Sequence, residues 1–324
     1  MQAEIGKDIS RAAALLRAGK LVAIPTETVY GLAGNALNEA AVASIFDTKE
    51  RPSFDPLIIH LPTLDHVAQY VQEIPPLAQR LADQFWPGPL TMVFARQPVV
   101  PDLVTAGLDT VAVRIPRHPL TRQLLLELDF PLAAPSANPF GYISPTSAEH
   151  VARQLGHKIP YVLDGGHCQV GLESTIVSFT GSEPVILRKG GIALEAIFAA
   201  LDSKVAVQTH SSSNPQAPGM LAKHYSPQVP FFLVTDLPDH QQLLRYSSIA
   251  RIVFGATSAP FPMGIPTTTF NLSVQGDFSQ AARKLFGLLR QLDDGNFDAI
   301  VADLLPERGL GRAINDRLRR AAAR

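Results

Sequence analysis

Cysteine is almost absent from this sequence, since Cys168 is the only one among 324 residues. A disulfide within the chain and a zinc site built from several cysteines are therefore excluded, and a reducing compartment fits. An excess of charge is also missing, because 28 Lys and Arg residues stand against 29 Asp and Glu, a net charge of −1. The chain as a whole thus has no positive field that would draw it to nucleic acid or to an anionic membrane.

Long hydrophobic runs are missing too. No apolar run approaches the roughly 20 residues that span a bilayer, and residues 1–20 lack the order of charged, apolar and small residues of a signal peptide. The expected location is cytoplasmic, with no membrane partner. The motifs G-x-x-x-x-G-K-[ST], G-x-G-x-x-G after a strand, H-E-x-x-H and G-x-S-x-G are absent. P-loop enzymes, common metalloproteases and serine hydrolases are therefore not indicated.

What is present is the composition of a globular protein, with 46% apolar and 18% charged residues. The length favours two domains. Short β-rich runs alternate with helical patterns, which predicts an α/β fold. In the first 200 residues, strands are expected at 21–24, 56–61, 90–94, 111–115, 132–134, 174–179 and 185–187, and helices at 9–17 and, after an N-cap at Asn38, up to about residue 48.

A linker is predicted at residues 203–229, because the stretch around H-S-S-S-N-P-Q-A-P-G has almost no periodic apolar content. It separates a first domain at 1–202 from a smaller α/β domain at 230–324. In the smaller domain, strands are expected at 231–234, 251–254 and 299–302, and helices at 278–292 and 312–322. The arginines of the last helix are interpreted as a solvated face, with a contact to RNA or a partner as the alternative.

Polar residues follow or interrupt several of the predicted strands. Side chains at strand ends face a shared crevice in open α/β sheets. The first group, P-T-E-T-V-Y-G-L at 25–32, offers hydroxyls and a carboxylate that can hold a small zwitterion. A polar turn ended by Gly31 is the alternative.

The second group joins Lys49 and Arg51 at a helix end to Asp55 and to His60 in the next strand. A point charge and a planar fork suit polyphosphate oxygens, although cations are also favoured at a helix C-terminus by its dipole. A lone histidine in an apolar strand, such as His60, is more often a hydrogen-bonded core residue than a ligand.

The third group lies on one strand, where Thr110, Ala112 and Arg114 share a face by the two-residue period. A buried arginine is costly unless it is paired. Arg114 therefore needs an anion, which is either an internal carboxylate or the carboxylate of a substrate.

The fourth group places hydroxyls and cations at strand edges beside small residues that let a ligand approach the backbone. Any one of these sites is also compatible with a turn. Its segments are A-A-P-S-A-N at 133–138, S-P-T at 144–146, E-S-T-I-V at 173–177 and L-R-K-G-G at 187–191.

Taken in order, these segments resemble the catalytic domain of the threonylcarbamoyl-AMP synthase family over about residues 8–200. The residues that carry the resemblance are P-T-E-T-V-Y-G-L, K-E-R-P, D-P-L-I-I-H, V-R-I-P, P-S-A-N, S-T-I-V and L-R-K-G-G-I. The stretches A-P-G-M-L-A-K-H-Y-S-P at 217–227 and G-L-G-R-A-I-N-D-R at 309–317 resemble the longer, two-domain branch. The resemblance implies a YrdC-like twisted mixed sheet with flanking helices, plus a smaller Rossmann-like C-terminal domain.

The resemblance also implies a reaction. L-threonine, bicarbonate and ATP would give L-threonylcarbamoyladenylate and pyrophosphate. The product would supply the threonylcarbamoyl group for a modified adenosine beside the tRNA anticodon, with a separate threonylcarbamoyl-transferase complex completing the transfer. ATP is a substrate here. Magnesium is expected with it, but the sequence identifies no set of protein ligands for the metal, and a direct contact with tRNA is an open expectation.

Family positions assign the site residues. Lys49 and Arg51 are expected to be catalytic. Threonine is expected to lie among Thr28, His60, Arg114, Ala134 and Ser174. ATP is expected to lie among Lys49, Arg51, Asp55, Thr110, Ser136, Ser144, Arg188 and Tyr225, the last as part of a lid from the linker.

Asp55 stands where the family often has asparagine, and a carboxylate only accepts hydrogen bonds. Direct contact with phosphate would be repulsive, so a sugar, base or magnesium-bridged role is expected. In the implied mechanism a carbamate of threonine attacks the α-phosphorus of ATP, and Lys49, Arg51 and Arg188 offset the repulsion between the two anions. Carbamates decompose in water, so a lid that excludes solvent would help.

Two other functions compete with this one. A protein that binds double-stranded RNA or tRNA without adenylate synthesis is the main alternative, although the near-zero net charge argues against it. Carbamoyl-adenylate chemistry on another acceptor, as in hydrogenase maturation proteins, is the third. That branch carries acylphosphatase and zinc-finger modules, and this chain has no cysteine clusters.

Overall fold

The computed structural model describes residues 2–209, 215–220, 224–256, 261, 264, 266–295 and 297–323. The chain forms two compact units. The first contains Met1–Phe140 and Ser144–Leu221, and the second contains Gly141–Ile143 and Ala222–Arg324. The boundary falls inside the stretch predicted as a linker, of which residues 210–214 and 221–223 lie outside the described residues.

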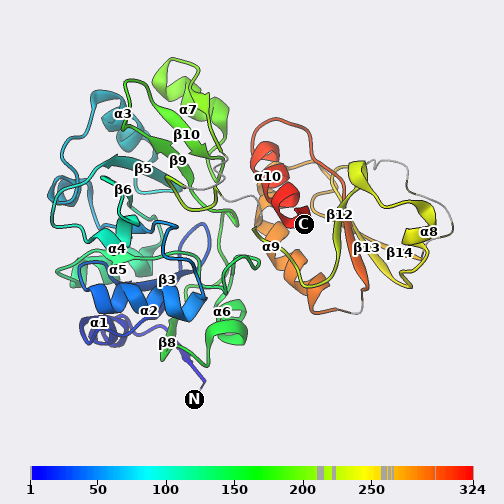
Figure 1. Ribbon diagram of the computed structural model, residues 1–324, viewed down its shortest axis with the longest axis horizontal. Coiled ribbons are helices and arrows are strands. Elements are labelled where there is room, and N and C mark those ends of the chain that lie inside the picture. The colour runs from blue at the N-terminus through cyan, green and yellow to red at the C-terminus, as the bar shows by residue number, and fades with distance from the viewer. Residues whose placement is uncertain are drawn as a thin grey trace. The chain divides into compact units, whose positions relative to one another are not determined.

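The first unit is built on an eleven-stranded mixed sheet with the order β1-β8-β2-β3-β7-β4-β6-β5-β9-β10-β11 (Figure 1). Parallel pairs such as β4 with β6 alternate with antiparallel ones such as β5 with β6. The expected mixed α/β sheet is thereby confirmed. The strands are β1 (Glu4–Gly6), β2 (Val22–Ile24), β3 (Gly31–Asn35), β4 (Ile58–His60), β5 (Leu90–Ala95), β6 (Thr110–Arg114), β7 (Leu132–Ala133), β8 (Tyr161–Leu163), β9 (Thr175–Ser178), β10 (Val185–Arg188) and β11 (Ala206–Val207).

Helices cover the two ends of this sheet differently. One helix pair, α1 and α5, packs together over β2, β3 and β8, whereas α3 and α7 pack together near β9 and β10 (Figure 1). Asp8 begins α1 by accepting a hydrogen bond from the Arg11 N–H at 2.9 Å. The helices are α1 (Ile9–Arg17), α2 (Glu39–Lys49), α3 (Pro76–Phe85), α4 (Asp102–Thr105), α5 (Pro119–Glu127), α6 (Ala148–Leu155) and α7 (Leu194–Leu201), with a 3-10 turn at Leu64–Gln69.

Strand alternation decides what the two faces of the central strands carry. On one face, Ile59, Met92 and Val113 enter the large core. On the other face, Ile58 and Ala112 belong to a smaller apolar cluster. Its members are Ile58, Val93, Ala112, Ile176, Leu187, Ala217 and Met220. The segment 215–220 contributes the last two residues of that cluster, so it covers part of this second face.

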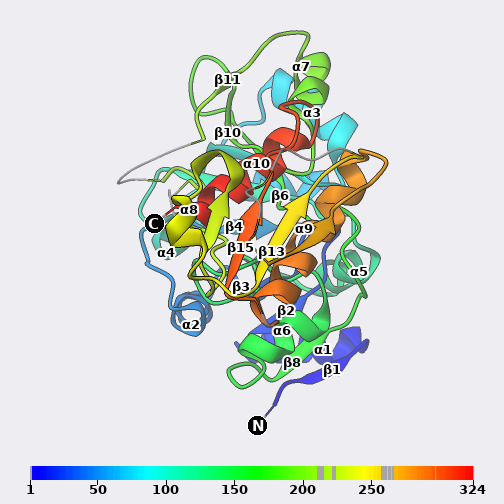
Figure 2. The same ribbon diagram turned by 90° about the vertical axis from the view of Figure 1, so that its right-hand side faces the viewer.

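The second unit holds a parallel sheet with the order β12-β15-β13-β14, in which β13 lies between β14 and β15. Figure 2 shows β13 beside β15. Its strands are β12 (Phe231–Leu233), β13 (Ile249–Val253), β14 (Thr267–Asn271) and β15 (Ala299–Ala302). Its helices are α8 (His240–Leu243), α9 (Phe278–Asp293) and α10 (Gly311–Ala322), with a 3-10 turn at Val234–Asp236. The expected smaller α/β domain is thus present. None of the helices in the described ranges is long and apolar enough to cross a membrane.

Two arginines of α10 correct the view of this helix as a solvated face. Arg317 is 0% exposed and Arg320 is 2% exposed. Both guanidinium groups bond to Asp316, at 3.2 Å from Arg317 and 3.0 Å from Arg320. Burial of charge is tolerated because the partner carboxylate is buried beside it. The charges of Arg317 and Arg320 therefore lie inside the second unit, whereas Arg319 on the same helix is exposed.

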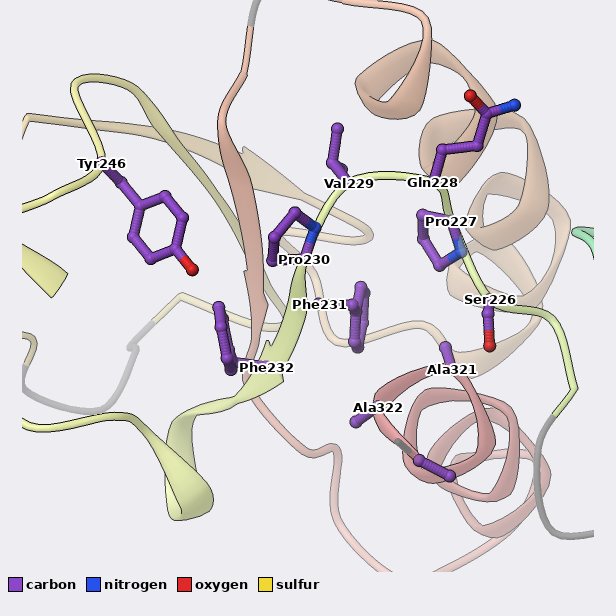
Figure 3. Close-up of a pocket in the computed structure, with 11 residues that line it drawn as sticks. Ser226, Pro227, Gln228, Val229, Pro230, Phe231, Phe232, Tyr246, Ala321 and Ala322 are labelled. Carbon is purple, nitrogen blue, oxygen red and sulfur yellow. The ribbon is translucent and has the colours of Figure 1, made fainter. Parts of the chain in front are cut away.

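An open pocket of about 380 Å³ lies beside β12 in the second unit. Aromatic side chains line it, and Figure 3 shows Phe231, Phe232 and Tyr246 around it together with residues 226–230 and the end of α10. None of the site residues predicted from the sequence lines this pocket.

Candidate active site

Lys49 ends α2 and ties it to the loop after β7. Glu50 takes a left-handed φ of 55°, which turns the chain out of the helix. The Lys49 Nζ atom donates to the carbonyl oxygens of Ser136 and Asn138, each at 2.5 Å. Burial lowers the pKa of Lys49 well below its usual value, and the nearby charge of Arg51 lowers it further. The structure thus brings the predicted residues Lys49 and Ser136 together, through the Ser136 backbone.

Arg51, two residues after Lys49, forms a buried ion pair with Asp55. Arg51 Nη2 lies 2.9 Å from Asp55 Oδ2, and it also donates to the carbonyl oxygen of Pro56 at 2.9 Å. The Arg51 Nε atom donates to the Asp55 carbonyl at 3.2 Å. The guanidinium is therefore fixed against one turn of backbone.

The carboxylate of Asp55 is an unusual group for so buried a position. It is 1% exposed, and neither of its oxygens accepts a hydrogen bond from a described residue. Burial raises the pKa of Asp55, although the charges of Arg51, Lys49 and Arg188 act in the opposite direction. Arg51, Lys49 and Arg188, which are all predicted to bind ATP, thus act on the carboxylate of Asp55, which is predicted to bind ATP as well.

Arg188, at the end of β10, holds a second group of predicted residues. Its Nη2 atom donates to Ser174 Oγ at 2.9 Å and its Nε atom to the Ser174 carbonyl at 3.0 Å. Its Nη1 atom donates to the carbonyl of Pro218 at 3.1 Å, and Thr91 Oγ1 lies 2.7 Å from Ser174 Oγ. Ser174, which is predicted to bind threonine, and Arg188, which is predicted to bind ATP, are therefore in direct contact. The segment 215–220 contacts this pair through Pro218.

Gly190 explains how the end of β10 comes so close to the backbone of Glu173 and Ser174. A Cβ atom on Gly190 would lie 2.4 Å from the Glu173 carbonyl oxygen. The Gly191 N–H donates to that same oxygen at 2.9 Å. The G-G pair thus permits the contact between Arg188 and Ser174.

Arg114 has an internal carboxylate as its partner. Its Nη2 atom donates to Glu27 Oε1 at 2.7 Å, and its Nε atom donates to the Gly88 carbonyl at 3.3 Å. Both side chains are buried, at 5% and 2% exposure. Of the two alternatives that the sequence left open, the structure shows the internal carboxylate.

His60 lies beside Arg114 and Leu132, its neighbours across β4, β6 and β7. Burial lowers the pKa of His60 to about 3, with the charge of Arg114 adding to the effect. The imidazole is therefore neutral at physiological pH. By strand alternation, His60 and Arg114 lie on the same face as Ile58 and Ala112.

The turn after β2 places Thr28 beside Thr26, with the two hydroxyl oxygens 2.7 Å apart. Thr26 Oγ1 also accepts from the Thr28 N–H at 3.1 Å. Close to this turn, the Ala134 N–H donates to the Ile58 carbonyl at 3.1 Å. A Cβ atom on Gly31 would lie 3.2 Å from the Ala134 Cβ, which is a tight contact, so the backbone at Gly31 lies close to the Ala134 side chain.

The remaining predicted residues are more scattered. Ser144 Oγ donates to Glu173 Oε1 at 2.6 Å. Thr110 begins β6, at the opposite end of the strand from Arg114. Tyr225 belongs to the second unit, where its ring stacks on Phe286 at 5.4 Å and lies 5.4 Å from the Arg317 guanidinium carbon.

Three buried polar residues in these contacts are not among the residues assigned by family position. Two of them, Glu27 and Glu173, lie in the segments 25–32 and 173–177 that the sequence analysis named as candidates. Glu27 pairs with Arg114, Glu173 accepts from Ser144, and Thr91 contacts Ser174. Glu27 and Glu173 each stand beside a predicted residue, so adjacency was a signal for them. Thr91 carried a weaker one, the interruption of an apolar strand by a hydroxyl on the site face.

The arrangement provides two charged regions. One region combines Lys49, Arg51 and Arg188 around Asp55, which suits a polyanion. The other combines Arg114 with a neutral His60, which suits a single carboxylate. In the described part of the chain, no three His, Cys, Asp or Glu side chains gather as a protein-bound metal would need.

Comparison with known proteins places this geometry in a family. A family model described as telomere recombination, Sua5_yciO_yrdC, matches residues 14–190, and a model described as threonylcarbamoyl-AMP synthase, C-terminal domain, matches residues 192–323. The threonylcarbamoyl-AMP synthase of Pyrococcus abyssi is 42% identical over 96% of this chain and 93% of its own length. That of Bacillus subtilis is 40% identical over 97% of this chain and 92% of its own length.

A solved structure agrees with these relatives. The crystal structure of P. abyssi Sua5 complexed with L-threonine matches 99% of this chain and 97% of its own, at 38% identity and a TM-score of 0.87. Both units are therefore covered by one relative. The chain belongs to the threonylcarbamoyl-AMP synthase family, in the form that carries the additional C-terminal domain.

Proposed function

We propose that this chain is an adenylate-forming transferase that converts L-threonine, bicarbonate and ATP to L-threonylcarbamoyladenylate and pyrophosphate. Three buried cations carry the proposal. Lys49, Arg51 and Arg188 are held by backbone carbonyls or by Ser174, so their positions are set before a ligand binds. Preorganised cations of this kind stabilise negative charge without the cost of reorganisation.

For ATP, we assign Lys49 and Arg51 as the catalytic cations. Together with Arg188, they would offset the repulsion between a carbamate and the α-phosphate. The threonine nitrogen first bonds to the bicarbonate carbon, which loses water and gives the carbamate. A carbamate oxygen then bonds to the α-phosphorus, and the bond from that phosphorus to the bridging oxygen breaks and releases pyrophosphate. The other residues proposed for ATP are Asp55, Thr110, Ser136, Ser144 and Tyr225.

For threonine, we assign the carboxylate to Arg114. Glu27 and Gly88 occupy its Nη2 and Nε atoms, whereas Nη1 donates to no described residue and remains for a substrate. Neutral His60 can share a proton with the substrate hydroxyl or amine without adding charge. Thr28, Ala134 and Ser174 complete the proposed threonine site, and the bond from Arg188 to Ser174 joins it to the ATP site.

Asp55 fits the expected magnesium ion. Magnesium is commonly bound by one or two carboxylates plus substrate phosphates. Asp55 Oδ1 is buried and accepts no hydrogen bond from a described residue, and Oδ2 is paired with Arg51 Nη2 at 2.9 Å. The ion would neutralise phosphate charge when bound. This assignment agrees with the expectation that Asp55 does not touch phosphate directly.

We further propose that the product passes to a threonylcarbamoyl-transferase complex acting on tRNA, in the cytoplasm. An acyl adenylate is an activated mixed anhydride that water destroys, so a second enzyme must consume it promptly. A direct tRNA contact by this chain belongs to the same proposal.

Pyrophosphate release by the purified protein tests the reaction, with ATP and bicarbonate present and with L-threonine, L-serine, L-alanine or no amino acid. Release that depends on threonine and is lost in Arg114→Ala is the expected result. Arg96→Ala is a matched control, because Arg96 also pairs with one carboxylate, Asp102, but in an exposed ion pair. Folded protein that releases no pyrophosphate with any amino acid would contradict the proposal and favour RNA binding without adenylate synthesis.

A further inference from the structure

Glu27 connects the exits of two strands through one buried carboxylate. It follows β2, and it is 2% exposed. Its Oε1 atom accepts from Arg114 Nη2 at 2.7 Å, and its Oε2 atom accepts from the Arg117 N–H at 3.0 Å. Arg114 ends β6 and Arg117 lies three residues further along. The carboxylate therefore bridges the side chain and the backbone of the same strand exit.

Both oxygens of Glu27 accept a hydrogen bond, one from Arg114 and one from Arg117, and these bonds decide whether the carboxylate can take up a proton. Burial alone would raise the pKa of Glu27, but the charge of Arg114 and the hydrogen bonds from Arg114 and Arg117 outweigh it and lower the pKa. The carboxylate stays ionised and is a poor acceptor for a substrate proton. A role as general base is therefore disfavoured, and a role through Arg114 is favoured.

Arg114 is held on two of its three nitrogens. Nε donates to the Gly88 carbonyl, and the Gly88 N–H donates to the Ile115 carbonyl at 2.8 Å. Nη2 is held by Glu27. Because a guanidinium is planar, fixing Nε and Nη2 also fixes the direction of the remaining Nη1 donors.

We infer that Glu27 is a positioning residue for the amino-acid substrate: it aims Arg114 Nη1 at the substrate carboxylate and balances the charge of Arg114. A balanced pair suits a zwitterion, which brings no net charge. An unbalanced, buried Arg114 would instead attract any small anion. This inference rests on the proposed function, because it concerns how the proposed threonine site selects its substrate.

Glu27→Gln tests the inference, because the amide keeps nearly the same shape and one acceptor oxygen but loses the charge. The KM for L-threonine is expected to rise about tenfold or more, the scale of one charge-assisted hydrogen bond. The KM for ATP is expected to change by less than about twofold. Inhibition by sulfate or by 3-hydroxybutyrate, which lacks the amine, is expected to strengthen relative to threonine binding, since the arginine is no longer balanced.

Two controls separate positioning from mere structural support. Glu4→Gln removes a carboxylate that pairs with Arg11 at 2.5 Å on an exposed surface, and it should leave both KM values unchanged. In an Arg114→Gln background, Glu27→Gln should add little to the KM for threonine, because residues that act through one another are not additive. Glu27→Asp keeps the charge but has a shorter side chain, so its KM for threonine should lie between those of the parent and of Glu27→Gln.

An unchanged KM for threonine in Glu27→Gln would overturn the inference, and so would parallel rises in both KM values with a lower melting temperature. If the unchanged chain releases no pyrophosphate with threonine, the proposed function fails instead. Calorimetric binding of threonine to the parent and to Glu27→Gln then still tests Glu27 separately. Should Glu27→Gln fail to fold, the same measurements on Glu27→Asp decide the matter.

Discussion

Single buried charges on the site face differ in how they are stabilised. Lys49 is held by two carbonyl oxygens, Arg114 by a carboxylate, and Asp55 by an ion pair alone. His60 remains neutral because burial lowers its pKa to about 3. Each group therefore responds differently to pH or to replacement, and two of these responses can be measured without knowing the substrate.

The first response is the pH dependence of stability caused by His60. Its pKa is about 3 in the folded state against 6.5 in an unfolded chain, so between these values only the unfolded state binds the proton. Stability from this group is then present above pH 6.5 and is lost as pH falls toward 3. Across that window we expect the loss to reach several kcal/mol, at roughly 1.4 kcal/mol per pKa unit.

Urea unfolding at pH 7, 5.5 and 4 measures this effect. His60→Gln cannot take up the proton, so its stability should fall less steeply with decreasing pH than that of the parent. His157→Gln, at an exposed position, should keep the parent slope. Equal slopes for the parent and His60→Gln would show that His60 is not kept neutral by burial.

The second response is a gain of stability in Asp55→Asn. The pKa of Asp55 is raised by burial, so its ionised form destabilises the fold at neutral pH despite the Arg51 pair. Removing that charge should stabilise the protein by about 1 kcal/mol, or roughly 2–4 °C in melting temperature. Calorimetry on Asp55→Asn, with the exposed Asp47→Asn as control, measures this. A lower melting temperature would mean that the pair with Arg51 outweighs the burial.

At the scale of elements, the sequence predicted those whose apolar pattern is regular. The helix predicted at 9–17 matches α1, and the strands predicted at 56–61, 90–94 and 111–115 overlap β4, β5 and β6. Strand β3, with the sequence G-L-A-G-N, was not predicted, because glycine and asparagine are poor strand formers. Its pairing with β2 and β7 outweighs this local preference. Likewise β14 is a run of three threonines at an edge, with little apolar signal.

The candidate site was predictable as a set of residues but not as a set of contacts. Motifs placed Ser174 and Arg188 in different roles, whereas the structure joins them by two hydrogen bonds. The need of Arg114 for an anion followed from burial alone. That Glu27 supplies it depends on the turn after β2 reaching the end of β6. Strands β3, β7 and β4 lie between β2 and β6 in the sheet, so this contact is not visible along the chain.

The segment 215–220 shows most clearly that contacts cannot be predicted from composition, because its composition predicted a linker. Instead Ala217 and Met220 are buried with Ile58 and Ala112, and Pro218 accepts a hydrogen bond from Arg188. Few apolar residues are enough here, because the strands supply the remainder of the cluster. The segment thus forms part of the first unit, over the strands that carry the proposed site.

Met220→Ala should therefore loosen this segment. Removing a buried methionine side chain costs about 2 kcal/mol or more, and the loss should appear in urea unfolding and in faster proteolysis between residues 203 and 229. Val207→Ala, at a position 41% exposed in β11, should have little effect on either. Equal proteolysis rates in the parent and Met220→Ala would mean that the segment is not held by this contact.

At the scale of the whole molecule, the second unit is built from two separate stretches of the chain, residues 141–143 and residues 222–324. Tyr225 has a left-handed φ of 62° and is 1% exposed, between Phe286 and Arg317. Asp293 accepts hydrogen bonds from the Tyr142 hydroxyl at 2.6 Å and from the Gln228 N–H at 2.7 Å. Residues 141–143, which the sequence assigned to the first domain, are thus anchored in the second unit. A cut at any single residue therefore does not separate the units cleanly.

Two truncated chains distinguish a linker that begins at residue 203 from a first unit that extends to residue 221. Both fragments, 1–203 and 1–221, lack the second unit, so residues 141–143 lose their partners equally in each. Only 1–221 keeps β11, the burial of Ala217 and Met220, and the hydrogen bond from Arg188 to Pro218. Those contacts should make 1–221 more stable in urea by at least about 2 kcal/mol. Equal stabilities would return the whole stretch to the role of a linker, because a segment that only connects two units adds nothing to the stability of either.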